Sequence, residues 1–483
     1  MDQLHYKSAV QLAGLIRRKK IGCLELLDHF LDRIETYNSK LNAIVWMDRD
    51  RARKRARAAD AALKKGKRFG PLHGVPMTIK ESYQVAGSPT TWGVPAMKDN
   101  VSETTAVAAQ RMIDAGVTLF GKTNVPIMLA DWQSYNAIYG TTNNPWDVSR
   151  TPGGSSGGSS AALSAGLTAI DAGSDIGSSI RNPAHYCGVF GHKPTHGVIS
   201  YRGHALPGAV AAPDISVVGP LARSADDLDA ALDIMAGADP DDGGAFKLAL
   251  PKCQKTSLRQ FRVAVKLADP NCDVDGEYAD QLQRLVDKLA RAGCKVKEAA
   301  PAIDTSRLHD VYVRLLRAAT SARMTDPEID ELRKTVADGD TDAFLVRTVD
   351  GVTMRHRNWL TLNNERHQMR LTFNAFFNDH DILLCPVAAS AAFPHNHEHE
   401  GKRWRRRITV NNKLAAASDQ LFWAGYSGVV LLPSTVGPAG IVPSGLPVGY
   451  QAIAAQGQDK TSIAFARLVE REFGGFTPPP GYD

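Results

Sequence analysis

Two serine-rich stretches and one lysine are the residues of this chain whose types suit hydrolytic chemistry. The first stretch, TPGGSSGGSSAA, covers residues 151–162, and the second, SDIGSSIRNP, covers residues 174–183. Lys80 closes an earlier segment, GVPMTIKES. A serine hydroxyl attacks a carbonyl carbon only after a base removes its proton, and an uncharged lysine amine can be that base. These residue types therefore favour cleavage of an acyl bond.

Lysine acts as a base only when its environment makes the ammonium form unfavourable. Lowering its pKa from about 10.4 to about 7 requires about 4.6 kcal/mol of preference for the neutral form, and burial can supply that. Val75, Met77 and Ile79 alternate along the chain, which predicts a strand with one buried face that ends at Lys80. The same alternation directs Glu81 to the opposite face, away from the amine.

The elements that must position these residues follow an α/β pattern. Apolar residues recur at helical spacing over residues 12–16 and 24–34, which predicts two N-terminal helices. Helix-like runs such as TAVAAQRMIDAG then alternate with short apolar strands such as VTLF and GVF. FRVAVKLAD, EYADQLQRLVDKLARAG and CKVKEAAP predict a further strand, helix and strand. DILLCPVA, GVVLLPSTV and LPVGYQAIAA return to strand character near the end.

We therefore expect a single large α/β/α domain, spanning 1–483, with a mixed central sheet covered by helices. Residues 1–70 form N-terminal helices in this interpretation, and 71–250 form the catalytic core. Residues 303–380 read as a mainly helical, polar-rich insertion that shapes the substrate pocket. Residues 381–483 supply the strands and helix that complete the core.

Composition excludes several classes of function. The chain has 57 Lys and Arg against 51 Asp and Glu in 483 residues, a net charge of +6, which is too thin a surplus to indicate nucleic-acid binding. Its most basic stretch, DRARKRARAADAALKKGKR, reads as a solvated amphipathic helix. Six scattered cysteines without a CxxC pair fit a reduced, cytoplasmic setting. The chain has no run of about 18 apolar residues, so we predict no membrane span.

Three other motifs have simpler interpretations. GVTLFGKT matches the phosphate-binding loop pattern, but its interior is a buried strand in character. GGSSG matches the nucleophile elbow, yet the polar, proline-bearing residues 143–152 before it do not resemble a strand. HNHEHE, ending at Glu400, reads as a solvated loop, so we expect no metal site and no cofactor. His185, His192 and His196 lie near the serines and fit structural roles at least as well as catalytic ones.

The remaining motifs together resemble the amidase signature family of amide hydrolases. The resemblance extends over most of the chain and is carried by GVPMTIKES, GKTNVP, GTTNNPWD, GGSSGGSSAALSAGL, FGHKPTHGVIS and SGLPVGYQAI. It implies a Ser-Ser-Lys triad in which Ser179 is the nucleophile, Ser155 is the bridging residue held by a cis peptide, and Lys80 is the general base. It also implies an acyl-enzyme intermediate in the hydrolysis of an amide, anilide or carbamate.

The resemblance also assigns the residues around the triad. Main-chain amides of Ile176, Gly177, Ser178 and Ser179 would form the oxyanion hole. Family members usually have glycine at the position of Ser178. The backbone amide survives this change, whereas a backbone angle that favours glycine would be strained by it. Ser156 and Asp175 would support the site by hydrogen bonds, with Arg181 anchoring the turn. Leu129 and Trp132 would contact substrate, and a plain core role for Trp132 is equally open.

Two alternatives to a stand-alone amidase stay open. One is a glutaminase subunit of a tRNA-dependent amidotransferase, which uses the same triad and passes ammonia to a partner. The other is a non-catalytic binding relative with a vestigial site. We expect a small-molecule amide or carbamate as the partner, with no nucleic acid and no membrane. The oligomeric state stays open, with a homodimer as one expectation.

Overall fold

The computed structural model describes residues 3–399 and 401–483 and has an eight-stranded sheet at its centre. The strand order is β10-β9-β11-β15-β14-β7-β8-β6. In chain order these strands are β6 (Asp171–Asp175), β7 (Phe190–Lys193), β8 (Val217–Ala222), β9 (Arg262–Val265), β10 (Lys295–Glu298), β11 (Ile382–Pro386), β14 (Ser434–Ile441) and β15 (Pro447–Ile453). β9 pairs in parallel with β10 and β11, and the other pairs are antiparallel. The prediction of a mixed central sheet is confirmed.

Lys80 belongs to a second, smaller sheet in the order β1-β3-β2. Its strands are β1 (Ile44–Met47), β2 (Pro76–Lys80) and β3 (Thr118–Thr123). A single bridge between Met77 and Ile170 joins β2 to the chain just before β6. The expectation of one buried face on β2 is wrong, because all five of its residues are buried. Its second face contacts β6, where Thr78 Oγ1 donates a hydrogen bond of 2.6 Å to Asp171 Oδ2.

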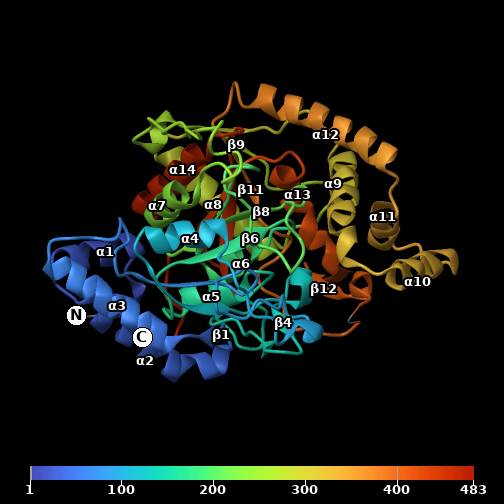
Figure 1. Cartoon of the computed structure of the whole chain (residues 1–483). Helices are drawn as coiled ribbons and strands as arrows, with labels where there is room; N and C mark the ends of the chain where they lie inside the picture. The colour runs from blue at the N-terminus through green and yellow to red at the C-terminus, as the bar shows by residue number, and fades with distance from the viewer. Residues whose placement is uncertain (1–2, 400) are drawn as a thin grey trace.

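Helices pack on the central sheet in two groups. In Figure 1 the strands β6, β8 and β11 lie between α5 and α6 on one side and α7, α8 and α14 on the other. These helices are α5 (Gly157–Ser164), α6 (Arg181–Cys187), α7 (Ala225–Met235), α8 (Gly276–Arg291) and α14 (Asp459–Phe473). The strand-helix-strand unit predicted from FRVAVKLAD onward is present as β9, α8 and β10.

The N-terminal helices lie at one side of the molecule, beside the C-terminus (Figure 1). They are α1 (Ala9–Arg17), α2 (Cys23–Leu41) and α3 (Arg49–Lys64), and α4 (Val107–Asp114) follows. Arg33 on α2 donates to the carbonyl oxygen of Tyr482 at 2.6 Å, which fixes the end of the chain. Only alanines of α3 are buried, so the basic stretch is an amphipathic helix with a solvated face, as predicted.

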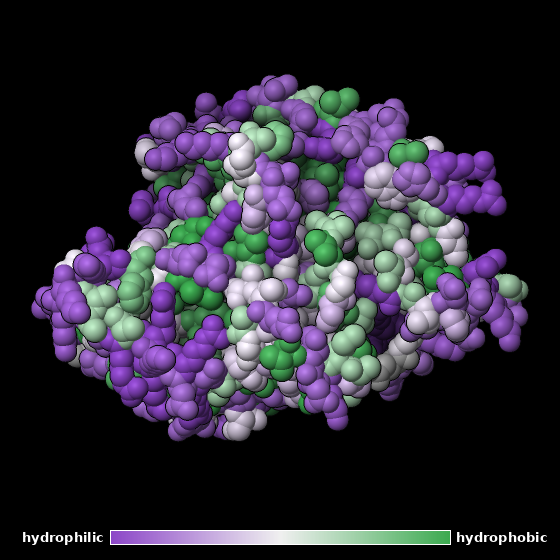
Figure 2. All heavy atoms as spheres, in the orientation of Figure 1, coloured by the Kyte–Doolittle hydropathy of each residue, from purple (hydrophilic) through white to green (hydrophobic). Residues whose placement is uncertain are grey.

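Residues 303–380 form four helices at the opposite side of the molecule (Figure 1). They are α9 (Thr305–Thr320), α10 (Asp326–Ala337), α11 (Ala343–Val352) and α12 (His356–Phe376). α9 contacts α11, α12 and α13 (Phe422–Gly428), and so connects this group to the core. Figure 2 shows mostly hydrophilic side chains over α3 and α12, with smaller hydrophobic patches between them.

One predicted strand region is largely helix and turn. GVVLLPSTV begins at the end of α13, and only its last residues belong to β14. α13 contains Gly425 and Gly428, and a Cβ at either would lie 3.0 Å from the ring of Tyr312. The two glycines leave room for α9 to pack close to α13 and the core. Strand periodicity in the sequence could not reveal this packing. Two short hairpins complete the fold: β4 (Tyr135–Asn136) with β5 (Gly140–Thr141), and β12 (Arg407–Val410) with β13 (Lys413–Ala416).

No helix among the described residues is both long and apolar enough to cross a membrane.

Candidate active site

The amine of Lys80 lies inside the protein among three serine hydroxyls. Its Nζ is 2.6 Å from Ser155 Oγ, 3.0 Å from Ser156 Oγ and 2.9 Å from Ser174 Oγ. Lys80 is fully buried at the end of β2. A neutral amine has two N–H donors and one lone pair, so three hydroxyl groups can satisfy it completely.

Burial lowers the pKa of Lys80 well below its usual range, although Asp175 and Asp171 act in the opposite direction. No described carboxylate forms an ion pair with the amine. Glu81, the next residue, points elsewhere: its carboxylate accepts the amide of Trp92 at 2.9 Å. The expectation that Glu81 faces away from the amine is confirmed, and the neutral form of Lys80 is favoured.

The two serine loops are joined through their backbones. The Gly154–Ser155 peptide bond is cis, as the resemblance implies. The amide of Ser156 donates to the carbonyl oxygen of Ser179 at 3.1 Å. Among the hydrogen bonds between described residues, none connects the hydroxyls of Ser155 and Ser179. The two loops therefore lie side by side.

In the turn from Ile176 to Ser179, three main-chain amides lack an acceptor among the described residues, rather than the four expected for an oxyanion hole. The amide of Ser178 donates to Asp175 Oδ1 at 3.0 Å, so its expected place in the oxyanion hole is not supported by this geometry. The amides of Ile176, Gly177 and Ser179 have no acceptor among the described residues. Ser178 has φ of 72°, a left-handed angle that favours glycine, so this chain holds serine where the turn suits glycine.

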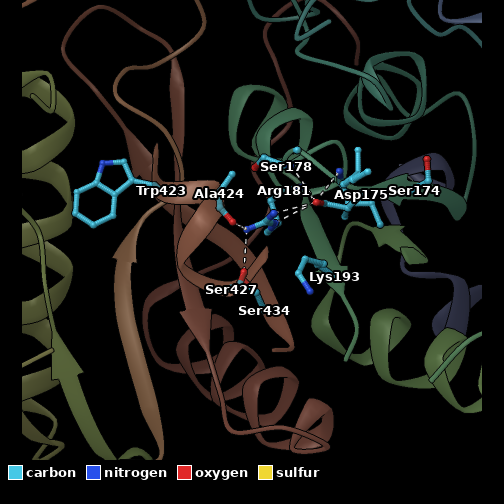
Figure 3. A network of polar contacts seen from close by, with 12 residues as sticks. Ser174, Asp175, Ser178, Arg181, Lys193, Trp423, Ala424, Ser427 and Ser434 are labelled. Atoms are coloured by element: carbon cyan, nitrogen blue, oxygen red, sulfur yellow. Dashed lines mark hydrogen bonds and ion pairs between the residues drawn. The ribbon is translucent and has the colours of Figure 1, made fainter. Parts of the chain in front are cut away.

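A buried ion pair holds the turn in place (Figure 3). Asp175 Oδ1 accepts Arg181 Nη2 at 2.9 Å, and Asp175 Oδ2 accepts Arg181 Nε at 3.0 Å. Arg181 Nη1 continues to the Ala424 carbonyl oxygen at 3.1 Å and to Ser427 Oγ at 2.9 Å, both on α13. Burial alone would raise the pKa of Asp175, but the Arg181 guanidinium, together with Lys193 and the Ile180 amide, holds that pKa below its usual range.

Ser179 opens into a cavity of about 400 Å³ that is walled by the helical insertion. Leu129 and Trp132 both line it, and Trp132 Nε1 also donates to the carbonyl oxygen of Gly177 at 2.7 Å. Helices α9, α10 and α11 supply one wall, and the segment that leads to β12 and α13 supplies another. Most of the lining is apolar, which suits a substrate with a hydrocarbon or aromatic body.

The motifs that compete with the triad lie in strands or in hydrogen-bonded positions of the fold. Residues of GVTLFGKT form β3, so the phosphate-loop reading is excluded. His185 Nε2 lies 3.0 Å from the Ser390 carbonyl oxygen, and its Nδ1 accepts the Gly449 amide. His192 lies 3.2 Å from Asp459 Oδ1. No strand precedes GGSSG over residues 143–152.

His196 and HNHEHE are the remaining two motifs. The ring of His196 forms no hydrogen bond with a described residue, and burial lowers its pKa. His395 Nε2 lies 3.1 Å from Asn143 Oδ1, while Glu400 at the end of HNHEHE lies outside the described residues. Within residues 3–399 and 401–483, no group of three His, Cys, Asp or Glu side chains is arranged to hold a metal ion.

The chain matches one family model and several known proteins. The family model described as Amidase matches residues 25–463. An acylamidase of Rhodococcus erythropolis is 32% identical to this chain, over 97% of the chain and 96% of that protein. The chain belongs to the amidase family.

Further relatives agree with this assignment. The amidase is 31% identical to an indoleacetamide hydrolase of Bradyrhizobium diazoefficiens, over 97% of its own length and 86% of that protein. Its fold matches the crystal structure of a bacterial aryl acylamidase with a TM-score of 0.83 and 24% identity, covering 98% of this chain and 97% of the other. The amidase is therefore an enzyme that hydrolyses amide bonds.

Sequence reasoning missed three groups in and around the site of this amidase. Ser174 is the third hydroxyl on Lys80, and its only signal is its place on β6, one residue before Asp175. Tyr312 donates to the Ile176 carbonyl oxygen at 2.8 Å from α9, far away in the chain. The arginines that line the cavity come from the insertion and the segment after it, where charge alone predicts a solvated surface.

Proposed function

We propose that this amidase cleaves a carbon-nitrogen bond with Ser179 as nucleophile, Ser155 as proton relay and Lys80 as general base. The observation that carries the proposal is the buried Lys80 amine 2.6 Å from Ser155 Oγ, with no carboxylate paired to it among the described residues. An amine held neutral in this way can accept a proton at the pH at which the enzyme works.

The proton moves in two steps. Ser155 Oγ gives its proton to Lys80 Nζ and takes the proton of Ser179 Oγ. Ser179 Oγ then bonds to the carbonyl carbon, and the carbonyl oxygen becomes negatively charged. The amides of Ile176, Gly177 and Ser179 are available to stabilise that oxyanion.

The return of the proton completes the cleavage. Lys80 gives its proton back through Ser155 to the substrate nitrogen, and the carbon-nitrogen bond breaks as the neutral amine leaves. The acyl group stays on Ser179 as an ester. Water then attacks that ester by the same path and releases a carboxylic acid. Ser156 and Ser174 keep the amine in place by accepting its N–H groups.

The substrate is a small amide, anilide or carbamate in this proposal. The relatives are named for acyl amides and for indoleacetamide, and the mostly apolar cavity suits a body of that kind. Leu129 and Trp132 contact this body at the end of the cavity that holds Gly177. The insertion 303–380 supplies helices α9 to α11, which carry part of the selectivity.

Hydrolysis of an acyl anilide panel by three variants tests the proposal. Ser179→Ala and Lys80→Ala should each lose at least about 10³-fold in turnover, because the three groups act as a unit. Ser164→Ala is the matched control, since the Ser164 hydroxyl is buried in α5 without a hydrogen-bond partner. A fluorophosphonate should label the wild type and not Ser179→Ala. Retained turnover in Ser179→Ala would reject the assignment.

The same experiments separate the alternatives. Glutamine hydrolysis that depends on a partner subunit and tRNA would indicate the glutaminase, and an unlabelled, inactive wild type would indicate a binding relative. A reduced, cytoplasmic compartment remains our expectation, supported by six cysteines that are all free thiols. A homodimer remains an expectation that sedimentation velocity measures.

A further inference from the structure

Four arginines in the wall of the cavity lack a carboxylate partner among the described residues, and one of them, Arg407, already donates to two backbone carbonyl oxygens. Arg317, Arg323 and Arg403 line the same cavity as Ser179, and none of them forms an ion pair with a described residue. Two acidic residues also line it, and both are already engaged. Asp131 pairs with Arg406, and the Glu328 carboxylate accepts the amide and hydroxyl of Thr325 at the start of α10.

Arg317 is the most constrained of the three. Its guanidinium lies 4.7 Å from the ring centre of Phe344 on α11. Its Nε is buried and has no hydrogen-bond partner. Burial and, to a smaller extent, the nearby Arg403 lower its pKa to about 9. A half-buried cation without a counter-ion is costly, and that cost is reduced when an anion binds.

Arg323 and Arg403 place two further cations in the same wall. The Arg323 guanidinium lies 4.7 Å from the ring centre of Trp92 and donates to the Met128 carbonyl oxygen at 3.5 Å. It also hydrogen-bonds the Tyr201 side chain, but no carboxylate of a described residue. Burial lowers the pKa of Arg323. Arg403 is half-buried in the 3-10 helix η6 (Arg403–Arg405). Planar guanidinium groups with free N–H donors match the two oxygens of a carboxylate.

The position of Arg317 on α9 places it close to the reacting serine. A Cβ on Gly177 would lie 3.5 Å from Leu316 Cδ1, so this turn of α9 lies against the turn that carries Ser179. Arg317 follows Leu316 directly. Arg323 is seven residues beyond Leu316, in the 3-10 turn η5 (Ser321–Arg323) that follows α9. The apolar side chains of Leu129, Trp132 and Phe344 line the space around them.

We propose that the substrate carries a carboxylate at the far end of an apolar body, and that Arg317, Arg323 and Arg403 bind this carboxylate. The inference rests on the proposed function, because it places the scissile amide at Ser179. The charged end takes no part in bond cleavage and holds the substrate in register. A hydrogen bond to a charged group contributes about 1.5 to 3 kcal/mol, enough for a tenfold or larger preference.

Matched charged and neutral amides test this inference. The first pair is the mono-4-nitroanilide of octanedioic acid and the 4-nitroanilide of octanoic acid, which places the charge on the acyl side. The second pair is N-octanoyl-4-aminobenzoate and octananilide, which places it on the amine side. We expect kcat/KM to favour the charged member of one pair by about tenfold or more. Calorimetric binding to Ser179→Ala makes the same comparison without turnover.

Variants then connect the preference to the arginines. Arg317→Gln and Arg323→Gln should each lower the charged-to-neutral ratio by about tenfold, and Arg317→Lys should keep part of it. Arg333→Gln is the matched control, because Arg333 pairs with Asp330 on the exposed side of α10 and does not line the cavity. Circular dichroism confirms that each variant is folded.

Separate outcomes reject the two proposals. Equal or better use of the neutral member in both pairs, in turnover and in binding, would overturn the carboxylate site. A preference that Arg317→Gln and Arg323→Gln leave unchanged would overturn it as well. Hydrolysis that persists in Ser179→Ala would instead reject the proposed function and leave the binding comparison to decide the carboxylate site.

Discussion

Tyr312 on α9 donates a hydrogen bond of 2.8 Å from its hydroxyl to the carbonyl oxygen of Ile176, in the turn that carries Ser179. The ring of Tyr312 packs against Gly425 and Gly428 of α13. Tyr312 thus connects the helical insertion to the turn that carries Ser179 through its hydroxyl, and to α13 through its ring.

Removing this hydroxyl should loosen the turn while the ring stays in place. We expect Tyr312→Phe to lower the free energy of unfolding by about 1 kcal/mol and kcat by about fivefold, with a smaller change in KM. Steady-state kinetics and urea unfolding measure both. Tyr450→Phe is the control, since the Tyr450 hydroxyl is buried without a partner. Equal effects of the two substitutions would contradict a positioning role for Tyr312.

The pH dependence of kcat/KM should contain an acidic limb that belongs to Lys80. Protonation of the amine removes the base, so activity falls as pH decreases. Because burial lowers the pKa of Lys80, the midpoint lies below the usual value of 10.5 for lysine. Asp171 raises that pKa, so Asp171→Asn should move the limb to lower pH. Asp330→Asn, on the exposed side of α10, should leave the limb where it is.

Stability should also depend on pH through Asp171. Burial raises the pKa of this carboxyl from 3.8 to about 7, so the folded protein binds the proton more tightly than the unfolded chain. Its contribution is therefore fully present below about pH 4 and is lost as pH rises to about 7. Three pKa units correspond to about 4 kcal/mol. The Asp171→Asn variant has no titrating group at this position, whereas Asp227 and Glu470, whose pKa values are raised to about 6 and about 7, titrate in both proteins. Urea unfolding between pH 4 and 8 should therefore show a larger loss for the wild type than for Asp171→Asn.

Ser178 should be a destabilising residue in its own turn. Its φ of 72° favours glycine, and its buried hydroxyl has no hydrogen-bond partner. We expect Ser178→Gly to raise the free energy of unfolding by about 1 kcal/mol. Ser160→Gly makes the same chemical change inside α5 and should lower it by about 0.5 to 1 kcal/mol. A loss of stability in both variants would show that the turn does not strain the serine.

The sequence was sufficient for features that rest on local periodicity and motif spacing. Alternation around Met77 predicted β2 and placed Lys80 at its end. The three catalytic assignments came from the motifs and stay predictions. The second buried face of β2 could not be predicted, because Thr78 reads as a solvent-facing residue until Asp171 is placed beside it. Ser178 could be identified as an unusual residue, yet only the structure gives its amide to Asp175. The unpaired state of Arg317 depends on tertiary contacts that no spacing encodes.

The proposed base and the proposed nucleophile are positioned by different sheets. Lys80 ends a strand of the small sheet, whereas Ser179 follows β6 at the edge of the large one, and one backbone bridge joins them. Their separation therefore depends on how the two sheets pack against each other. A slight parting along that seam would let water reach the amine and favour its charged form, so we expect mild heating to lower activity before the helices and strands unfold.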